Sequence, residues 1–320
     1  TYTGTGSTTY GPLSTAPTAV GTYTVTPSAA VFSSGSSSNY AIQYAAGTLT
    51  ISQAAQATLS MTSASTLEFG GSLTLSTSGG SGTGAVTYAV STAGTAGCSI
   101  SGTTLSVTGD SGSTCAVTAT KAADTSYLSA SSSAQTITVT TRSITVTASS
   151  PSISYGASVS PTVSVTTGSL SGSDTISGAT YTYTGTGGTT YGPLTTAPTA
   201  VGTYSVTPSS ATFSSGSSSN YAISYSAGTL TISQAAQATL GFAVTSATLG
   251  GTTSLAITGG SGSGAVTYSL DAAGTASCSL SGSTLSYTSG GTCTISATKA
   301  ADASYLSATT GSVTFTVNGP

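Results

Sequence analysis

Aliphatic residues alternate with threonine in short stretches along most of the chain. Clear examples are Leu49–Ile51, Ile137–Val139, Ile144–Val146 and Leu230–Ile232. Strict alternation places the aliphatic side chains on one face of a β-strand and the hydroxyl groups on the other. Threonine is itself well suited to a pleated, half-exposed surface. The pattern therefore predicts folded β modules with a core, rather than a disordered hydroxyl-rich stalk.

Clusters of Gly, Pro, Ser and Asn separate these stretches at intervals of roughly 8–12 residues, which is typical of β-sandwiches. No segment has the pattern of a helix longer than one turn, and no apolar run approaches the roughly 20 residues of a membrane helix. We expect an all-β fold of tandem Ig-like β-sandwich modules.

The chain repeats itself with a period of about 180 residues, because Thr1–Leu13 recurs almost unchanged as Thr182–Leu194. This period fits two small β domains. We expect one module type at 1–55, of which only the later part is present, and complete at 142–235. The second type, which carries the cysteines, is expected at 56–141 and 236–320.

The expected joints are short and contain neither Gly nor Pro: Thr140–Arg142 is one, and Ser233–Gln237 is another. Flexible linkers are longer and rich in Gly and Ser. The joints therefore predict a stiff, extended rod. We expect the sequence to be a slice of a longer array. The alternative is that another chain supplies the missing strands of 1–55 by strand complementation.

Charge is nearly absent, with three Lys or Arg, six Asp or Glu and no His, for a net charge of −3. Ser and Thr make up about two-fifths of the chain. Three isolated cations cannot bind nucleic acid or an anionic membrane. Nucleophilic catalysis by a Ser–His or Cys–His system needs histidine, and the scattered acids suit neither a glycosidase nor a calcium site. We expect no enzymatic activity, cofactor or metal.

The glycine-rich stretches Gly79–Gly84 and Gly259–Gly264 lack the following Lys and helix of a phosphate-binding loop, and we interpret them as turns. Lys121 and Asp124, repeated as Lys299 and Asp302, allow two interpretations. One is an intramolecular isopeptide cross-link. The one we favour is an ordinary ion pair that stabilises the turn.

Each copy of the cysteine module has one cysteine pair, Cys98 with Cys115 and Cys278 with Cys293. Three connectivities are possible in principle. Pairing within a module is favoured because the pair repeats with the unit, and it implies an oxidising compartment. Buried free thiols are an alternative. Zinc is disfavoured because neither histidine nor a CxxC spacing is present.

Tyrosine is abundant, at 17 residues. One set alternates with small residues and recurs in both copies: Tyr40, Tyr44, Tyr221 and Tyr225. These rings could form a stacking platform for surface glycans. Half-buried packing, with the hydroxyl toward water, is the more usual role of such residues, and we favour it.

Two stretches, SNYAISYSAGTLTIS (Ser219–Ser233) and ITVTASSPSISYG (Ile144–Gly156), resemble MBG-type repeats of large bacterial surface proteins. The cysteine module resembles bacterial Ig-like repeats through GSGTGAVTYAV (Gly80–Val90) and TCAVTATKAADTSYLSAS (Thr114–Ser131). The resemblance implies a secreted or cell-surface adhesin, stalk or fibre, and hence an extracellular location. Its expected partners are other copies of itself, lateral or end to end.

Two other functions are weighed against this structural role. A carbohydrate-binding module would use the tyrosine set. An ice-binding surface would use ranks such as Thr136–Thr138 and Thr145–Thr147, but the repeat is far longer than that of a flat solenoid. A structural segment for reach and attachment is the function that the sequence favours.

Overall fold

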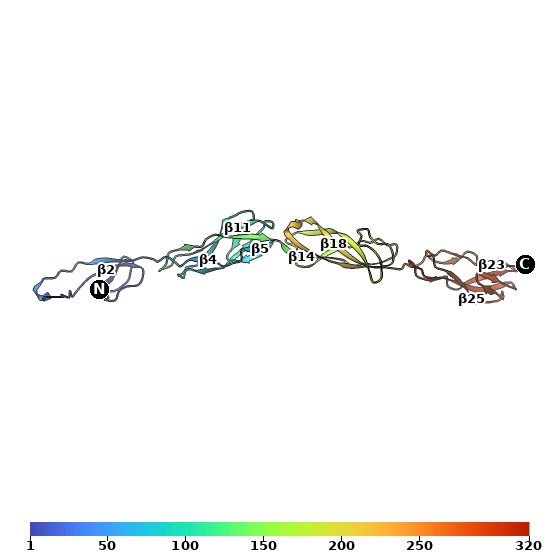
Figure 1. Cartoon of the computed structure of the whole chain (residues 1–320). Coiled ribbons are helices and arrows are strands. Elements are labelled where there is room, and N and C mark those ends of the chain that lie inside the picture. Colours follow the sequence, from blue (N-terminus) through green and yellow to red (C-terminus); the bar gives the residue numbers. More distant parts are fainter. Residues whose placement is uncertain (320) are drawn as a thin grey trace. The chain divides into compact units, whose positions relative to one another are not determined.

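The computed structural model describes residues 1–319 (Figure 1). These residues form strands, turns and two single-turn 3-10 helices, η1 (Ser37–Asn39) and η2 (Ser218–Asn220). Contacts divide the chain into two compact units. The first holds Thr1–Arg142 together with Ser219–Ala222, and the second holds most of the chain from Ser143 onward. The predicted all-β fold is confirmed.

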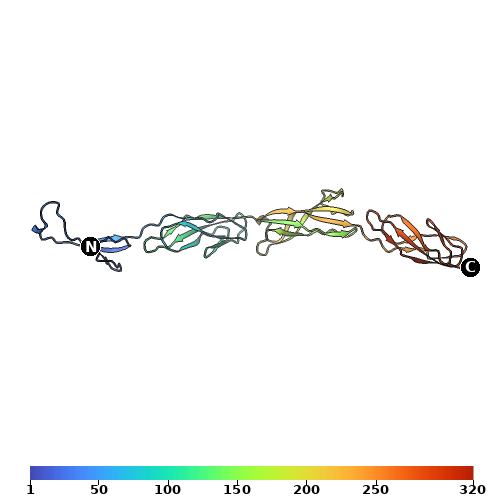
Figure 2. The ribbon, with the colours of Figure 1, turned by 90° about the horizontal axis from the view of Figure 1, so that it is seen from below.

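The first unit begins with a three-stranded antiparallel sheet, the N-terminal sheet, in the order β1-β2-β3. Its strands are β1 (Tyr2–Thr5), β2 (Gly21–Val25) and β3 (Gly47–Ile51). Tyr23 lies at its centre and is only 1 % exposed. Residues 27–46 form a long loop that contains η1 and no strand (Figure 2).

The first cysteine sandwich follows, with β8, β12, β11, β13 and β5 in one sheet, β6-β10-β9 in a second and β4-β7 as a short pair. Leu105, Val117 and Ile137 are fully buried between the two larger sheets. Its strands are β4 (Leu59–Met61), β5 (Thr66–Glu68), β6 (Ser72–Thr74), β7 (Thr77–Gly79), β8 (Val86–Thr92), β9 (Ser99–Ser101), β10 (Thr104–Ser106), β11 (Thr114–Lys121), β12 (Ala130–Ser131) and β13 (Gln135–Thr140).

The second unit contains the cysteine-free sandwich, whose sheets have the orders β16-β14-β19 and β15-β20-β18-β17. Its core consists of Tyr183, Tyr204, Val206, Leu230 and Ile232, with Ala148. Its strands are β14 (Arg142–Ala148), β15 (Ser152–Ser154), β16 (Val163–Thr167), β17 (Thr175–Thr186), β18 (Gly202–Ser215), β19 (Tyr221–Ser226) and β20 (Gly228–Ser233).

The second cysteine sandwich has the same arrangement as the first: β22-β30-β28-β25 with β29 beside β28, then β23-β27-β26, and β21-β24. Leu285, Ile295 and Phe315 are fully buried in it. Its strands are β21 (Gly241–Phe242), β22 (Ser246–Thr248), β23 (Thr252–Ser254), β24 (Ile257–Thr258), β25 (Val266–Ala272), β26 (Ser279–Ser281), β27 (Thr284–Ser286), β28 (Gly291–Lys299), β29 (Ala308–Thr309) and β30 (Val313–Asn318).

Some hydroxyl groups on the outer faces of these sheets form hydrogen bonds with one another. Thr147 Oγ1 lies 2.7 Å from Thr166 Oγ1 across strands β14 and β16, and Thr120 Oγ1 lies 2.9 Å from Ser131 Oγ across β11 and β12. Opposed hydroxyl pairs of this kind stabilise neighbouring strands modestly. The alternation of Thr with aliphatic residues therefore yields a core on one side and a neutral, hydrogen-bonded surface on the other.

Candidate functional site

Within residues 1–319 no three His, Cys, Asp or Glu side chains cluster together, and the most specific geometry lies in the segments that link the sheets. The first joint is Gln53–Gln56 against the turns of the first cysteine sandwich, and the second joint is Gln234–Gln237 against those of the second. Each joint lies inside one unit. Of these two, only Ser233–Gln237 was expected from the sequence as a short linker.

The backbone of each connector is paired like a strand. At the second joint, the N–H of Ala235 donates to the carbonyl of Ser304 at 3.0 Å, and its own carbonyl accepts from the N–H of Leu306 at 2.9 Å. At the first joint, Ala54 makes the same two bonds, each 2.9 Å long, with the carbonyl of Ser126 and the N–H of Leu128. Both bonds of each alanine go to one neighbouring segment, as in a parallel β-bridge, and they restrict the torsion angles of the connector, which a free linker would not do.

Two glutamines flank this alanine and fasten the connector to two turns of the cysteine sandwich. Gln237 Oε1 accepts from the N–H groups of Ser261 and Gly262 at 3.1 and 3.2 Å, while its Nε2 donates to the carbonyl of Ala300 at 3.3 Å. Gln234 Nε2 donates to the carbonyl of Asp302. The primary amide is suited to this role because it offers a donor and an acceptor at one end.

The first joint repeats the same contacts with Gln53 and Gln56. Gln53 Nε2 donates to the carbonyl of Asp124, and Gln56 Nε2 donates to that of Ala122 at 3.1 Å. Gln56 Oε1 accepts from the N–H of Gly82 at 3.5 Å. Two joints about 180 residues apart therefore share one hydrogen-bonding scheme.

An aspartate organises each receiving turn. Asp302 Oδ1 accepts from the backbone N–H groups of Ser304 and Tyr305 at 2.8 and 2.9 Å, and Oδ2 accepts from the N–H of Ser263 and, at 3.1 Å, from its hydroxyl. These donors, first those of Ser304 and Ser263, stabilise the ionised form and lower the pKa of Asp302 to about 2. Asp124 has equivalent partners in Ser126, Thr83 and Tyr127, and its pKa is lowered for the same reason.

The carboxylate also explains one glycine of each Gly-rich turn. A Cβ at Gly262 would collide with Asp302 Oδ2, and a Cβ at Gly82 would collide with Asp124 Oδ2. Only a residue without a side chain allows the turn to approach the carboxylate this closely. The glycine stretches are thus turns, as interpreted, and their specific task is to present N–H groups to an aspartate.

The favoured ion pair between Lys121 and Asp124, and between Lys299 and Asp302, is wrong. Within residues 1–319 each aspartate takes its hydrogen bonds from N–H and hydroxyl groups, and neither lysine forms an ion pair with it. The fold brings Thr83 and Ser263 to the carboxylates from distant positions in the sequence, which local spacing cannot reveal. The isopeptide cross-link stays untested.

Aromatic contact supports the second joint as well. Tyr155 of the cysteine-free sandwich packs edge-on against Tyr305, with ring centroids 5.4 Å apart. Edge-to-face pairs of this kind add to the stabilisation that burial alone provides. Tyr305 therefore makes two contacts at this joint: its backbone N–H donates to Asp302, and its ring packs against Tyr155 of the cysteine-free sandwich.

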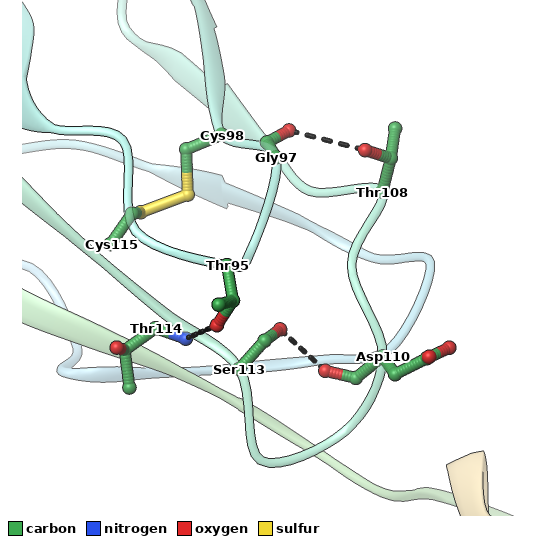
Figure 3. Close-up of a disulfide and its surroundings, with 8 residues drawn as sticks. All are labelled: Thr95, Gly97, Cys98, Thr108, Asp110, Ser113, Thr114 and Cys115. Atoms are coloured by element: carbon green, nitrogen blue, oxygen red, sulfur yellow. Dashed lines mark hydrogen bonds between the residues drawn. A yellow bond between two sulfur atoms is a disulfide. The ribbon is translucent and has the colours of Figure 1, made fainter.

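The cysteines of each sandwich are bonded to each other, Cys98 to Cys115 and Cys278 to Cys293. Figure 3 shows the first disulfide, where the loop is also held by Thr108 Oγ1, which donates to the carbonyl of Gly97 at 3.3 Å. On the next turn of the same loop, the hydroxyl of Ser113 donates to the carbonyl of Asp110 at 2.5 Å. Each disulfide joins a loop residue to the central strand of the larger sheet, β11 or β28.

The four tyrosines proposed as a glycan platform differ in their environments. Tyr40 is 63 % exposed and stacks on Phe32, whereas Tyr221 is 5 % exposed. The hydroxyl groups of Tyr44 and Tyr225 each accept a backbone N–H at 2.8 Å. The set is therefore not one uniform sugar-stacking surface, and packing accounts best for Tyr221.

One contact of the first unit has no signal in the sequence. The side chain of Asn220, 2 % exposed, donates to Asp110 Oδ1 at 2.8 Å and accepts from the N–H of Ser111 at 2.9 Å. Beside it, the rings of Phe69 and Tyr221 meet edge-on at 5.8 Å. A buried side-chain amide needs hydrogen-bond partners, but nothing in the sequence around Asn220 indicates which residues they are.

Residues 1–319 contain no group of three or more His, Cys, Asp or Glu side chains close enough to hold a metal ion. Within the same described range, no helix is long and apolar enough to cross a membrane.

Residues 144–231 fit the family model described as MBG domain (YGX type). The predicted resemblance to MBG-type repeats is therefore confirmed for this segment. Its alternation with Ig-like repeats stays a prediction. No curated protein matches the chain.

Three solved structures are similar to long stretches of the chain. Drosophila N-cadherin EC1-4 is 11 % identical over 94 % of this chain and 83 % of its own, with a TM-score of 0.25. The S-layer protein rSbsC(31-844) is 15 % identical over 95 % and 45 %, with a TM-score of 0.29. Protocadherin gamma B7 is 12 % identical over 87 % and 81 %, with a TM-score of 0.23. Scores this low support no conclusion about function.

Proposed function

We propose that this chain is a structural segment of an extracellular or cell-surface bacterial fibre, stalk or adhesin, and that its task is to provide reach. The observation that carries the proposal is the repeated joint. At Ala54 and again at Ala235, both the N–H and the C=O of the connector are hydrogen-bonded to one segment of the sandwich that follows.

Such joints resist bending because a bend has to break several hydrogen bonds at once. The connector, two glutamines and an aspartate-centred turn act together at each joint. An enzyme has no evident use for this feature, since catalysis needs convergent reactive groups rather than fixed spacing between sandwiches. A stalk or fibre depends on it.

The two disulfides favour an extracellular location. Disulfides persist in oxidising compartments and are rare where thiols are kept reduced. Each of them closes a loop within one sandwich, of 17 and 15 residues by separation in sequence. They stabilise each sandwich separately, which suits a protein exposed to an oxidising environment.

Distance measurements between spin labels test the proposal. One label on β16 and one on β29 report the spread of distances across the second joint. We expect a narrow distribution for the unmodified chain and a broad one for the double variant Gln234→Ala, Gln237→Ala, which loses the amide contacts. The matched control is Gln43→Ala, since Gln43 is exposed and has no side-chain hydrogen bond within residues 1–319. A broad distribution in the unmodified chain would refute a stiff joint.

A further inference from the structure

We propose that strand β25 of the second cysteine sandwich, and likewise β8 of the first, is a self-pairing edge that binds the same strand of a second copy of this chain in antiparallel orientation. The inference rests on the proposed structural role. It adds to that role the surface through which copies of the chain associate side by side.

Both strands lie at the edge of their sheet and pair on one side only, β25 with β28 and β8 with β11. The N–H of Ala300 donates to the carbonyl of Ala265 at 2.8 Å, which fixes the phase of the ladder. Because hydrogen-bonding residues alternate along an antiparallel strand, Thr267 and Ser269 face β28, while Val266, Tyr268 and Leu270 direct their N–H and C=O groups outward. The bond from Ala122 to Ala85 at 2.9 Å gives β8 the same phase.

The stretch Val266–Leu270 of the edge carries none of the features that usually prevent pairing, and the charge of Asp271 lies beyond it on the same strand. Natural edge strands are protected by charged residues, proline or β-bulges. Val266–Leu270 has no charge and no proline, and its register with β28 is continuous, with a bulge only beyond Leu270. The edge strand β17 of the cysteine-free sandwich makes an instructive contrast, because three irregularities interrupt it between Thr175 and Thr180.

Apolar surface remains uncovered at the same edge. Val266, Tyr268 and Leu270 point toward the core but stay only partly buried, whereas Ile295 on the adjacent β28 is fully buried. A shallow hollow beside the strand is lined by Val266, Tyr268 and Leu280. One further strand on this edge would cover the hollow and extend the sheet.

The sequence of the edge favours a second copy as that strand. In an antiparallel pair centred on Tyr268, each Tyr268 faces the other, Val266 faces Leu270, and Thr267 faces Ser269. Apolar residues then meet apolar residues on the core side, and hydroxyl groups meet hydroxyl groups on the outer side, as they do at Thr120 and Ser131 within this chain. Such a two-fold contact is self-complementary. The corresponding stretch of β8, Val86–Val90, reads V-T-Y-A-V and has the same symmetry.

Each chain carries the edge twice, in β8 and in β25, so a chain that pairs through one edge keeps the other available for a further copy. With a net charge of only −3 over 320 residues, little long-range repulsion opposes the approach of a second copy.

Charge exchange at the edge tests the proposal on the full chain. A Lys variant carries lysine at four exposed positions of the two edges, and a Glu variant carries glutamate at the same positions: Thr87, Ala89, Thr267 and Ser269. In the antiparallel pair these residues face one another, so like charges oppose within each variant and opposite charges meet in the mixture. The control carries four lysines on the other sheets, in β10 and β27: Thr104, Ser106, Thr284 and Ser286.

Sedimentation velocity and amide exchange supply the readouts. We expect the unmodified chain to associate as its concentration rises, and the amides of Val266, Tyr268 and Leu270 to exchange more slowly in the associated state. The Lys variant alone and the Glu variant alone should lose the association and the slower exchange. A mixture of the two variants should regain both. The control variant should associate as the unmodified chain does.

Three results would overturn the inference: a chain that is monomeric at every concentration, association that the Lys variant leaves intact, or no recovery on mixing. A monomer that keeps a narrow spin-label distribution at the second joint would remove edge pairing and leave the proposed function standing.

Discussion

At the scale of single residues, one position differs between the two cysteine sandwiches in a way that should change their free energies of unfolding. Gly97 and Ser277 hold equivalent places before the first cysteine of each pair, and both have positive φ, 56° and 47°. This left-handed conformation suits glycine and costs another L-residue about 1–2 kcal/mol. The second sandwich therefore carries local strain that the first does not.

Ser277→Gly should relieve this strain. We expect the second cysteine sandwich to gain about 1 kcal/mol, because part of the relief is offset by the greater freedom of glycine in the unfolded chain. Gly97→Ser should do the opposite in the first sandwich, where the new Cβ would also meet Thr108 Oγ1. Hydrogen exchange of buried amides on β28 and β11 separates the two sandwiches. An unchanged β28 after Ser277→Gly would show that the loop adapts to serine without strain.

Asp302 makes the second joint sensitive to acid. Its pKa is about 2 in the folded chain against 3.8 for an ordinary aspartate, so the ionised form is bound by the turn. A depressed pKa contributes stability that is complete above the unfolded value and is lost as the pH falls through the folded value. We therefore expect the protection of the Ala235 and Tyr305 amides, measured against their intrinsic exchange rate at each pH, to fall between about pH 4 and pH 2.

Asp302→Asn serves as the reference for this titration. Asparagine keeps one acceptor oxygen and cannot ionise, so exchange at the joint should be faster at neutral pH and should lose its acid step. Lys299→Gln is the matched control, because Lys299 is not paired with the aspartate within residues 1–319. If Asp302→Asn retained the acid step, another group would be responsible for it.

At the scale of elements, each disulfide ties a loop to the central strand of the larger sheet. Replacing Cys278 and Cys293 together by serine opens a loop with a sequence separation of 15. The chain-entropy model gives a loss of about 3 kcal/mol for a loop of this size. We expect earlier urea unfolding of the second cysteine sandwich, while the first keeps its midpoint. Equal losses in both would mean that the sandwiches unfold as one unit.

Strands and core were predictable from the sequence because their cause is local. In β28 the buried residues Cys293, Ile295 and Ala297 alternate with Thr292 and Thr294, so periodicity alone identifies the inward face. The module boundaries expected from the repeat stay a prediction.

The partners of Asp302, by contrast, could not be predicted. Its N–H donors at Ser304 and Tyr305 are close in sequence, but Ser263 is 39 residues away. Only the folded sandwich brings the turn of Ser263 to the carboxylate. From the sequence, the nearby Lys299 was therefore the expected partner of Asp302. The contact of Asn220 with Asp110, 110 residues apart, is hidden for the same reason.

At the scale of the whole molecule, cohesion comes almost entirely from neutral groups. Three cations and six acids are distributed over 320 residues, and the joints are made of amide, hydroxyl and backbone hydrogen bonds around one carboxylate. Salt screens exposed charges over about 10 Å at 0.1 M and 3 Å at 1 M. Because few charge–charge interactions hold this chain together, added salt should change its stability little.

The spread of spin-label distances across the second joint should therefore stay constant from low salt to about 1 M NaCl, where surface ion pairs are fully screened. The same labels should report a broader distribution below about pH 3, as protonation of Asp302 releases the N–H groups of Ser263, Ser304 and Tyr305. The two responses discriminate between causes. Broadening with salt at neutral pH would mean that ion pairs hold the joint, whereas acid broadening alone identifies the aspartate-centred turn as the element that sets its stiffness.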